Sequence, residues 1–110
     1  MSPLGAGLLL ARCDDIADPG AIVIASGGAS LILTRRGEHI AAFFNRCAHA
    51  DYPLQRADGR LLVQEGRYLV CAVHGASFAL EDGACAGGPC NGKGLTRVAV
   101  EVRDGAVWSA

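Results

Sequence analysis

Two short stretches that each pair a cysteine with a histidine constrain the fold of this chain more than any other feature. The first is Cys47-Ala48-His49 and the second is Cys71-Ala72-Val73-His74. Thiolates and imidazoles are both strong metal ligands, and two Cys-His pairs with such similar spacings rarely arise by chance. The pattern predicts a fold that brings two loops together around a metal centre.

A set of two thiolates and two imidazoles limits which metal centres these residues can bind. A Rieske-type 2Fe-2S centre uses two Cys on one iron and two His on the other, unlike an all-cysteine ferredoxin cluster. A tetrahedral zinc ion accepts the same ligands, but zinc sites usually have two tight knuckles, and here residues 50–70 separate the pairs. A single 2Fe-2S cluster is therefore favoured, and a structural zinc module or a redox-sensing module remains the alternative.

Over residues 21–108 the chain resembles the Rieske ferredoxin family. The resemblance implies that Cys47 and Cys71 bind the inner iron, while His49 and His74 bind the outer iron nearer to solvent. Replacing two thiolates by neutral imidazoles removes negative charge from the outer iron, so the electron is expected to reside there.

The resemblance also covers residues around the ligands. Leu54 stands at an apolar position after the first ligand loop, residues 74–78 resemble the second loop, and Gly87-Gly88-Pro89 looks like the proline loop that covers the cluster. One departure is that the segment 50–70 is longer than in small Rieske ferredoxins. It contains turn-like Glu65-Gly66, so the extra length is expected to form an enlarged loop or a hairpin.

The strand pattern predicts an all-β fold. Short apolar runs with Gly-rich turns and no sustained helical periodicity argue for an antiparallel β-sandwich or barrel with little helix. The expected strands cover residues 8–13, 21–25, 31–34, 40–44, 68–70, 77–80, 96–102 and 106–108. Residues 96–102 alternate most clearly, with Val98, Val100 and Val102 on one side. We expect one Rieske-like domain over residues 1–110, with a small cluster-binding subdomain at about 45–90 that is formed by the two ligand loops.

Composition excludes several classes of partner. The net charge is −1, from 10 basic and 11 acidic residues, which gives no electrostatic reason to bind nucleic acid or an anionic membrane. No stretch approaches the roughly 20 apolar residues that span a bilayer. The chain is therefore expected to be a cytoplasmic protein.

The resemblance implies a one-electron carrier that accepts electrons from a reductase and passes them to a terminal oxidoreductase, such as an oxygenase. The chain offers no nucleophile-base pair and no dinucleotide-binding motif, so no catalysis of its own is expected. A small subunit of a larger reductase is the alternative within this class. The donor, the acceptor and the oligomeric state are left open by the sequence.

The resemblance also bears on the redox potential. High-potential family members carry an extra Cys in each ligand loop, and Tyr52 and Val73 stand at these positions here. Those members also donate hydrogen bonds to the cluster from a Ser and a Tyr, where this chain has Ala76 and Phe78. Fewer donors to the sulfurs stabilise the reduced state less, which predicts a potential on the order of −150 mV.

Other cysteines and aromatic residues receive simpler interpretations. Cys85 and Cys90 flank the proline loop, where they could be core thiols, alternative metal ligands or a disulfide that closes the loop. Free thiols are favoured, because cytosolic disulfides are uncommon. Cys13 is expected to be a small buried hydrophobe, and Trp108 to belong to the core. His39 follows a turn and is expected to be a solvated edge residue.

Overall fold

The structure is a computed structural model that describes residues 7–26, 28–46, 53–55, 59–72, 75–88 and 93–110. Within this part of the chain, antiparallel strands form three sheets, and the one helix is a 3-10 turn, η1 (Cys13–Asp15). The first sheet has the order β1 (Leu9–Arg12), β11 (Ala106–Ser109), β10 (Val100–Arg103). The central sheet has the order β2 (Gly20–Ser26), β3 (Ala29–Arg36), β4 (His39–Phe44), β9 (Arg97–Val98). The third sheet has the order β5 (Leu62–Gln64), β6 (Tyr68–Val70), β7 (Ser77–Ala79), β8 (Cys85–Gly87).

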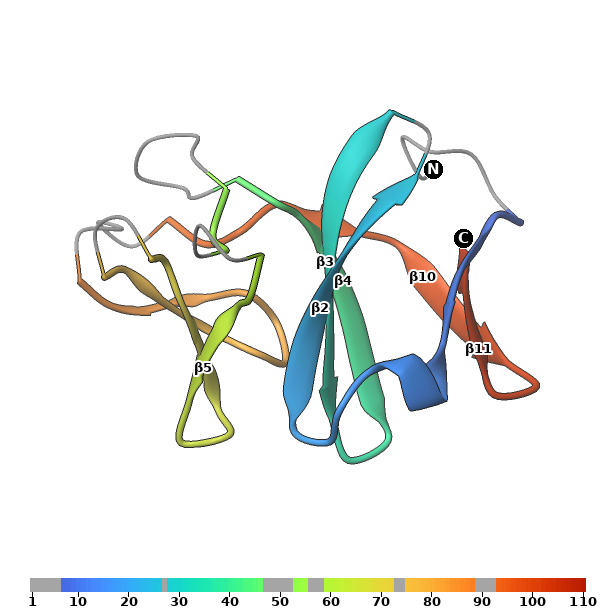
Figure 1. The fold of residues 1–110 in the computed structure, drawn as a ribbon, viewed down its shortest axis with the longest axis horizontal. Coiled ribbons are helices and arrows are strands. Elements are labelled where there is room, and N and C mark those ends of the chain that lie inside the picture. Colours follow the sequence, from blue (N-terminus) through green and yellow to red (C-terminus); the bar gives the residue numbers. More distant parts are fainter. Residues whose placement is uncertain (1–6, 27, 47–52, 56–58, 73–74, 89–92) are drawn as a thin grey trace.

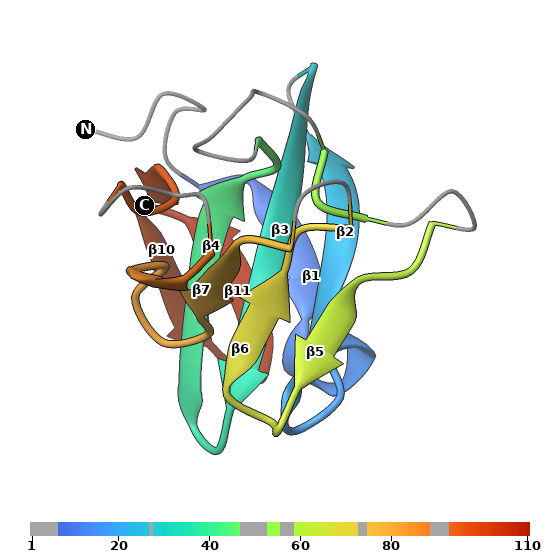
Figure 2. The same ribbon diagram turned by 90° about the vertical axis from the view of Figure 1, so that its left-hand side faces the viewer.

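The central sheet lies between the other two and is buried on both faces (Figures 1 and 2). Successive side chains of a strand point to opposite faces, so one apolar run can serve two cores. In β3, Leu31 and Leu33 join the core shared with the first sheet, while Ile32 joins the core shared with the third sheet. Full burial of each contributes about 1.5–3 kcal/mol. The continuous apolar run of β3 therefore makes this sheet the platform for both neighbours.

The extra segment between the two Cys-His pairs contributes a β-hairpin, as expected. Strand β5 pairs with β6 through Leu62–Val70 and Gln64–Tyr68. Glu65 and Gly66 in the turn have φ angles of 57° and 64°. Two left-handed residues in succession suit the right-handed twist of the flanking strands. Strand β5 of this hairpin lies at the edge of the third sheet.

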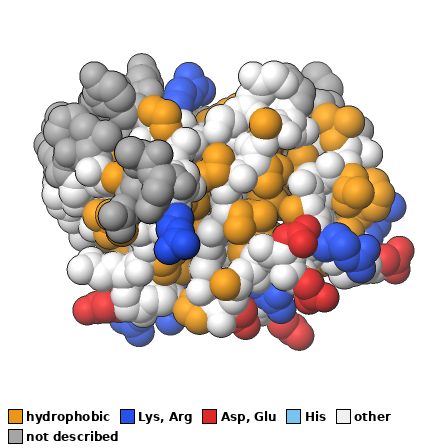
Figure 3. All heavy atoms as spheres, viewed as in Figure 1, with side chains coloured by type: hydrophobic (Ala, Val, Ile, Leu, Met, Phe, Trp, Pro, Cys, Tyr) orange, Lys and Arg blue, Asp and Glu red, His pale blue; other side chains and the backbone are white. Residues whose placement is uncertain are grey.

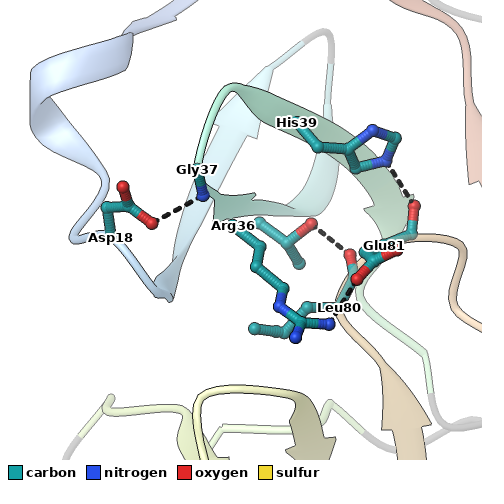
Figure 4. A network of polar contacts seen from close by, with 7 residues as sticks. Asp18, Arg36, Gly37, His39, Leu80 and Glu81 are labelled. Atoms are coloured by element: carbon teal, nitrogen blue, oxygen red, sulfur yellow. Dashed lines mark hydrogen bonds and ion pairs between the residues drawn. The ribbon is translucent and has the colours of Figure 1, made fainter.

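Polar contacts also join the central sheet to the turn between β7 and β8 (Figure 4). The hydroxyl of Thr34 donates to the carbonyl oxygen of Leu80 at 2.6 Å in a buried position. Arg36 forms an ion pair with Glu81. His39 is exposed, but its Nε2 donates to the carbonyl oxygen of Glu81 at 2.8 Å, so it is more than a solvated edge residue. These contacts fix the β7–β8 turn to β3 and β4.

The segment predicted as one strand over residues 96–102 divides between two sheets. Strand β9 pairs with β4 in the central sheet, whereas β10 pairs with β11 in the first sheet. Val98 is therefore 1% exposed and Val102 is 49% exposed. The prediction that one strand carries the three valines on one side is wrong, because the chain changes sheets at Ala99.

The outer surface of the first sheet differs from expectation at Trp108. Trp108 is only partly buried, and the guanidinium of Arg103 lies 4.9 Å from its ring centroid. The predicted core position is therefore wrong, and an arginine covers the ring instead. Cys13 packs against the core of the first and central sheets, as expected of a small hydrophobic residue, but its side chain is only partly buried.

Apolar side chains lie scattered over the face shown in Figure 3, with charged side chains along its lower edge. The large hydrophobic residues that are exposed in the described part of the chain are Leu8, Leu9 and Val102. They all lie in or beside the first sheet. No helix among the described residues has the length and hydropathy needed to cross a bilayer.

The buried hydrogen bond of Thr34 can be tested by replacing this residue with valine, which has nearly the same shape. The Thr34→Val variant leaves the carbonyl group of Leu80 without this donor, which is expected to lower the free energy of unfolding by about 1–3 kcal/mol. Chemical denaturation followed by circular dichroism measures the change. Thr96→Val is the matched control at an exposed site and is expected to stay within about 0.5 kcal/mol of the wild type. Equal stability of the two variants would contradict the role of this bond.

Candidate metal centre

Of the four predicted ligands, the structure describes Cys71. Cys47, His49 and His74 lie outside the described residues, so their convergence stays a prediction. Cys71 directly follows β6, is fully buried and takes no part in a disulfide. It belongs to the core between the central and third sheets, together with Leu54, Ala76 and Phe78. A buried thiol in an apolar setting at a loop base suits a cluster ligand.

The second ligand loop is closed by backbone hydrogen bonds at its base. The amide of Cys71 donates to the carbonyl oxygen of Ala76 at 2.7 Å, and the amide of Gly75 donates to the carbonyl oxygen of Cys71 at 2.9 Å. Gly75 has a φ angle of 77°, which a residue with a side chain rarely adopts. The loop therefore leaves β6 and returns to β7 within a few residues, with its ends held together.

The loop after β8 packs closely against this second ligand loop. A Cβ atom placed on Gly88 would lie 2.8 Å from the carbonyl oxygen of Gly75 and 2.9 Å from Cα of Ala76. Only glycine allows two backbones to approach so closely. The resemblance implied that residues 87–89 cover the cluster, and Gly88 does contact the loop beside Cys71, whereas Pro89 lies outside the described residues.

The first ligand loop is tied to the second loop at its base. Leu54 follows the first Cys-His pair and is fully buried. Its carbonyl oxygen accepts a hydrogen bond at 3.2 Å from the amide of Ala72, the residue after Cys71. Its amide donates at 2.9 Å to Oδ1 of Asn45, two residues before Cys47. The bases of the two loops therefore meet at Leu54.

Sequence reasoning identified Leu54 but missed Asn45. The only signal was a single polar residue directly after the apolar run of β4, and side chains in such positions often face solvent. Asn45 is 4% exposed instead. Its partner Leu54 is distant in sequence, so the pairing depends on tertiary structure.

The two residues on which the expected low redox potential rests lie in the described part of the chain. Ala76 and Phe78 are both fully buried, and neither has a hydroxyl group. No three or more side chains of His, Cys, Asp or Glu gather at one point among the described residues, which include only one predicted ligand. The donor chemistry at Cys71 and the joined loop bases fit a 2Fe-2S cluster held between the two loops.

The structure corrects the expectation for Cys85. Cys85 is disulfide-bonded, so the predicted free thiol at this position is wrong. Cys90 lies outside the described residues. The expectation rested on the rarity of disulfides in the cytosol, which says nothing about the approach of two particular cysteines.

Comparison with known structures finds the same fold in stand-alone ferredoxins. The ferredoxin of carbazole 1,9a-dioxygenase from Nocardioides aromaticivorans IC177 has 20% identity and a TM-score of 0.78, covering 96% of this chain and 98% of that chain. A ferredoxin from Sphingomonas yanoikuyae B1 has 24% identity and a TM-score of 0.75, covering 94% and 96%. The complex of reduced oxygenase and oxidized ferredoxin in carbazole 1,9a-dioxygenase gives 26% identity and a TM-score of 0.75, covering 94% and 91%.

The fold also occurs inside a larger enzyme. The terminal oxygenase of carbazole 1,9a-dioxygenase from Nocardioides aromaticivorans IC177 has 21% identity and a TM-score of 0.74, covering 93% of this chain but 29% of that chain. Comparison with curated proteins finds no match. The family model of the Rieske [2Fe-2S] domain matches residues 8–103. The chain therefore belongs to the Rieske [2Fe-2S] domain family, whose cofactor is a 2Fe-2S cluster.

Proposed function

We propose that Cys47, His49, Cys71 and His74 hold one 2Fe-2S cluster, with the two cysteines on the inner iron and the two histidines on the outer iron. The observation that carries this assignment is the buried, unpaired thiol of Cys71, which lies at the point where the two loop bases are hydrogen-bonded. The family match supports the same set, because each Cys-His pair falls within the matched residues.

The proposed activity is the transfer of single electrons without chemical change of a substrate. A bound 2Fe-2S cluster supplies one transferable electron. The chain holds Cys71 in a fixed position, because β6 precedes this residue and its backbone hydrogen bonds close the loop that leads to β7. The histidine side of the centre is proposed to face the partner, where electrons enter and leave.

The proposed partners are a reductase as donor and a terminal oxygenase as acceptor. One structural neighbour is named as a complex between an oxygenase and a ferredoxin, and it is 26% identical to this chain. The likeness to ferredoxins extends over nearly the full length of both chains, whereas the likeness to an oxygenase is confined to part of the larger chain. This pattern favours a ferredoxin over a Rieske domain that serves a larger oxidoreductase.

The cluster-binding part is proposed to be residues 45–90 of one domain. This part contains the third sheet, whose residues Leu69 and Phe78 share a core with Ile32 and Phe43 of the central sheet. Leu80, directly after β7, belongs to the same core. The third sheet therefore shares its core with the central sheet, which supports a single folding unit.

Electron transfer can be tested directly with purified components. The reduced protein is mixed with an oxidised terminal oxygenase, and cluster reoxidation is followed by absorbance in a stopped-flow instrument. Rapid reoxidation, together with reduction by a ferredoxin reductase, is expected of a carrier. A cluster that exchanges electrons with neither component, but changes the binding of another protein, would favour the redox-sensing alternative.

The ligand assignment predicts different outcomes for two cysteines that are both free. Cys71→Ser is expected to lower iron bound per chain more than about tenfold, since loss of a direct ligand exceeds the roughly 10–100-fold cost of losing an outer partner. Cys13 packs against the core between the first and central sheets, so Cys13→Ser is expected to keep the cluster. Iron analysis and visible absorption measure both. Full iron content in Cys71→Ser would remove this residue from the ligand set.

The spectroscopic and redox properties should match mixed ligation without hydroxyl donors. Reduction with dithionite is expected to give an EPR spectrum with an average g value below that of all-cysteine clusters. Because the side chains of Ala76 and Phe78 have no hydroxyl group to donate to cluster sulfurs, voltammetry is expected to give a midpoint on the order of −150 mV. A clearly positive midpoint would contradict the argument from missing donors.

A further inference from the structure

The side chain of Asn45 makes three hydrogen bonds although it is almost completely buried. Its Oδ1 accepts from the amide of Leu54 at 2.9 Å. Its Nδ2 donates to Oε1 of Gln55 at 2.6 Å and to the hydroxyl of Ser30 at 3.1 Å. Leu54 and Gln55 follow the first ligand loop, and Asn45 precedes it. One side chain therefore connects the two ends of that loop.

Hydrogen-bonding chemistry explains why an amide occupies this position. A backbone N–H can only donate, so the group facing Leu54 must be the oxygen of the amide. The two amide hydrogens are then both used, one by Gln55 and one by Ser30. Alanine would leave the amide of Leu54 without this partner in a buried position, which is unfavourable for a backbone donor.

The connection continues to the second ligand loop. The carbonyl oxygen of Leu54 accepts from the amide of Ala72, which is covalently bonded to Cys71. Asn45, Leu54 and Ala72 therefore form one chain of hydrogen bonds between the base of the first loop and the base of the second loop. Asn45 also lies on a rigid element, because its backbone amide donates to the carbonyl oxygen of Ser30 in the central sheet at 2.9 Å.

From this geometry we infer that Asn45 is a positioning residue for the metal centre: it fixes the relative placement of both ligand loops and so controls how tightly the iron is retained. The inference rests on the proposed ligand set, and it assigns Asn45 no contact with the cluster. Residues that hold metal ligands in place typically change metal retention by 10–100-fold when replaced. Asn45 acts in this way through backbone groups of Leu54 instead of through the ligand side chains.

The test compares Asn45→Ala with Thr34→Val, which also removes a buried hydrogen bond to a backbone group, but at the β7–β8 turn. Cluster-loaded proteins are mixed with an iron chelator, and iron release is followed over time. Asn45→Ala is expected to release iron about 10–100-fold faster than the wild type and to show altered EPR g values. Thr34→Val is expected to keep the wild-type g values despite its lower stability. Altered g values in both variants to the same extent would mean that only general stability matters.

Asn45→Asp provides a rescue and covers the case in which the alanine variant takes up no cluster. Aspartate keeps an oxygen for the amide of Leu54, and the hydroxyl of Ser30 and the amide of Gln55 can each turn to donate to it. This variant is expected to retain the cluster, with release close to the wild-type rate. If Asn45→Asp is as defective as Asn45→Ala, the proposed role is overturned.

The EPR spectrum of the wild-type protein tests the ligand assignment, and the comparison with Asn45→Ala tests the role of Asn45. A wild-type protein without the mixed histidine-cysteine EPR signal would overturn the ligand assignment itself. A wild-type protein with that signal, and an Asn45→Ala variant with unchanged release rate and g values, would overturn the role of Asn45 alone.

Discussion

The burial of the central sheet on both faces is the constraint on which the rest of the structure depends. Residues 31–34 of β3 are all buried, and they alternate between the core of the first sheet and the core of the third sheet. Packing on two sides gives β3 and β4 little freedom to move. Asn45 directly follows β4, so the first ligand loop starts from a fixed point. The base of the proposed first ligand loop is therefore held by a strand pair that contains none of the four proposed ligands.

Three contacts then attach the proposed cluster-binding part to this platform. The first is a shared apolar core, which includes Phe43 of the central sheet and Phe78 of the third sheet. The hydrogen bond from Thr34 to Leu80 sets the position of the β7–β8 turn. The hydrogen bond that the amide of Leu54 donates to Oδ1 of Asn45 does the same for the base of the first ligand loop. Hydrophobic burial is not directional, so the two buried polar contacts specify the placement that the apolar core stabilises.

The backbone around Cys71 shows how the second loop can be short and still be precise. Hydrogen bonds join Cys71 to both Ala76 and Gly75, and Gly88 approaches at a distance that excludes any side chain. A site on a loop is accurate only when its supporting contacts are satisfied. The described hydrogen bonds give this support at the base of the loop, beside Cys71.

The sequence by itself determined the family, the all-β class and most strands, because ligand spacing, alternation and glycine-rich turns are local features. From the Glu65-Gly66 turn it also predicted an enlarged loop or a hairpin before the second Cys-His pair, and the structure has the hairpin. Tertiary structure decided what depends on partners distant in the chain. Only the assembled sheets show that residues 96–102 divide at Ala99 and that Arg103 covers Trp108. The same holds for the pairing of Asn45 with Leu54. A hydrogen bond between separate segments depends on how the backbone folds, so it cannot be predicted from the residues next to either partner.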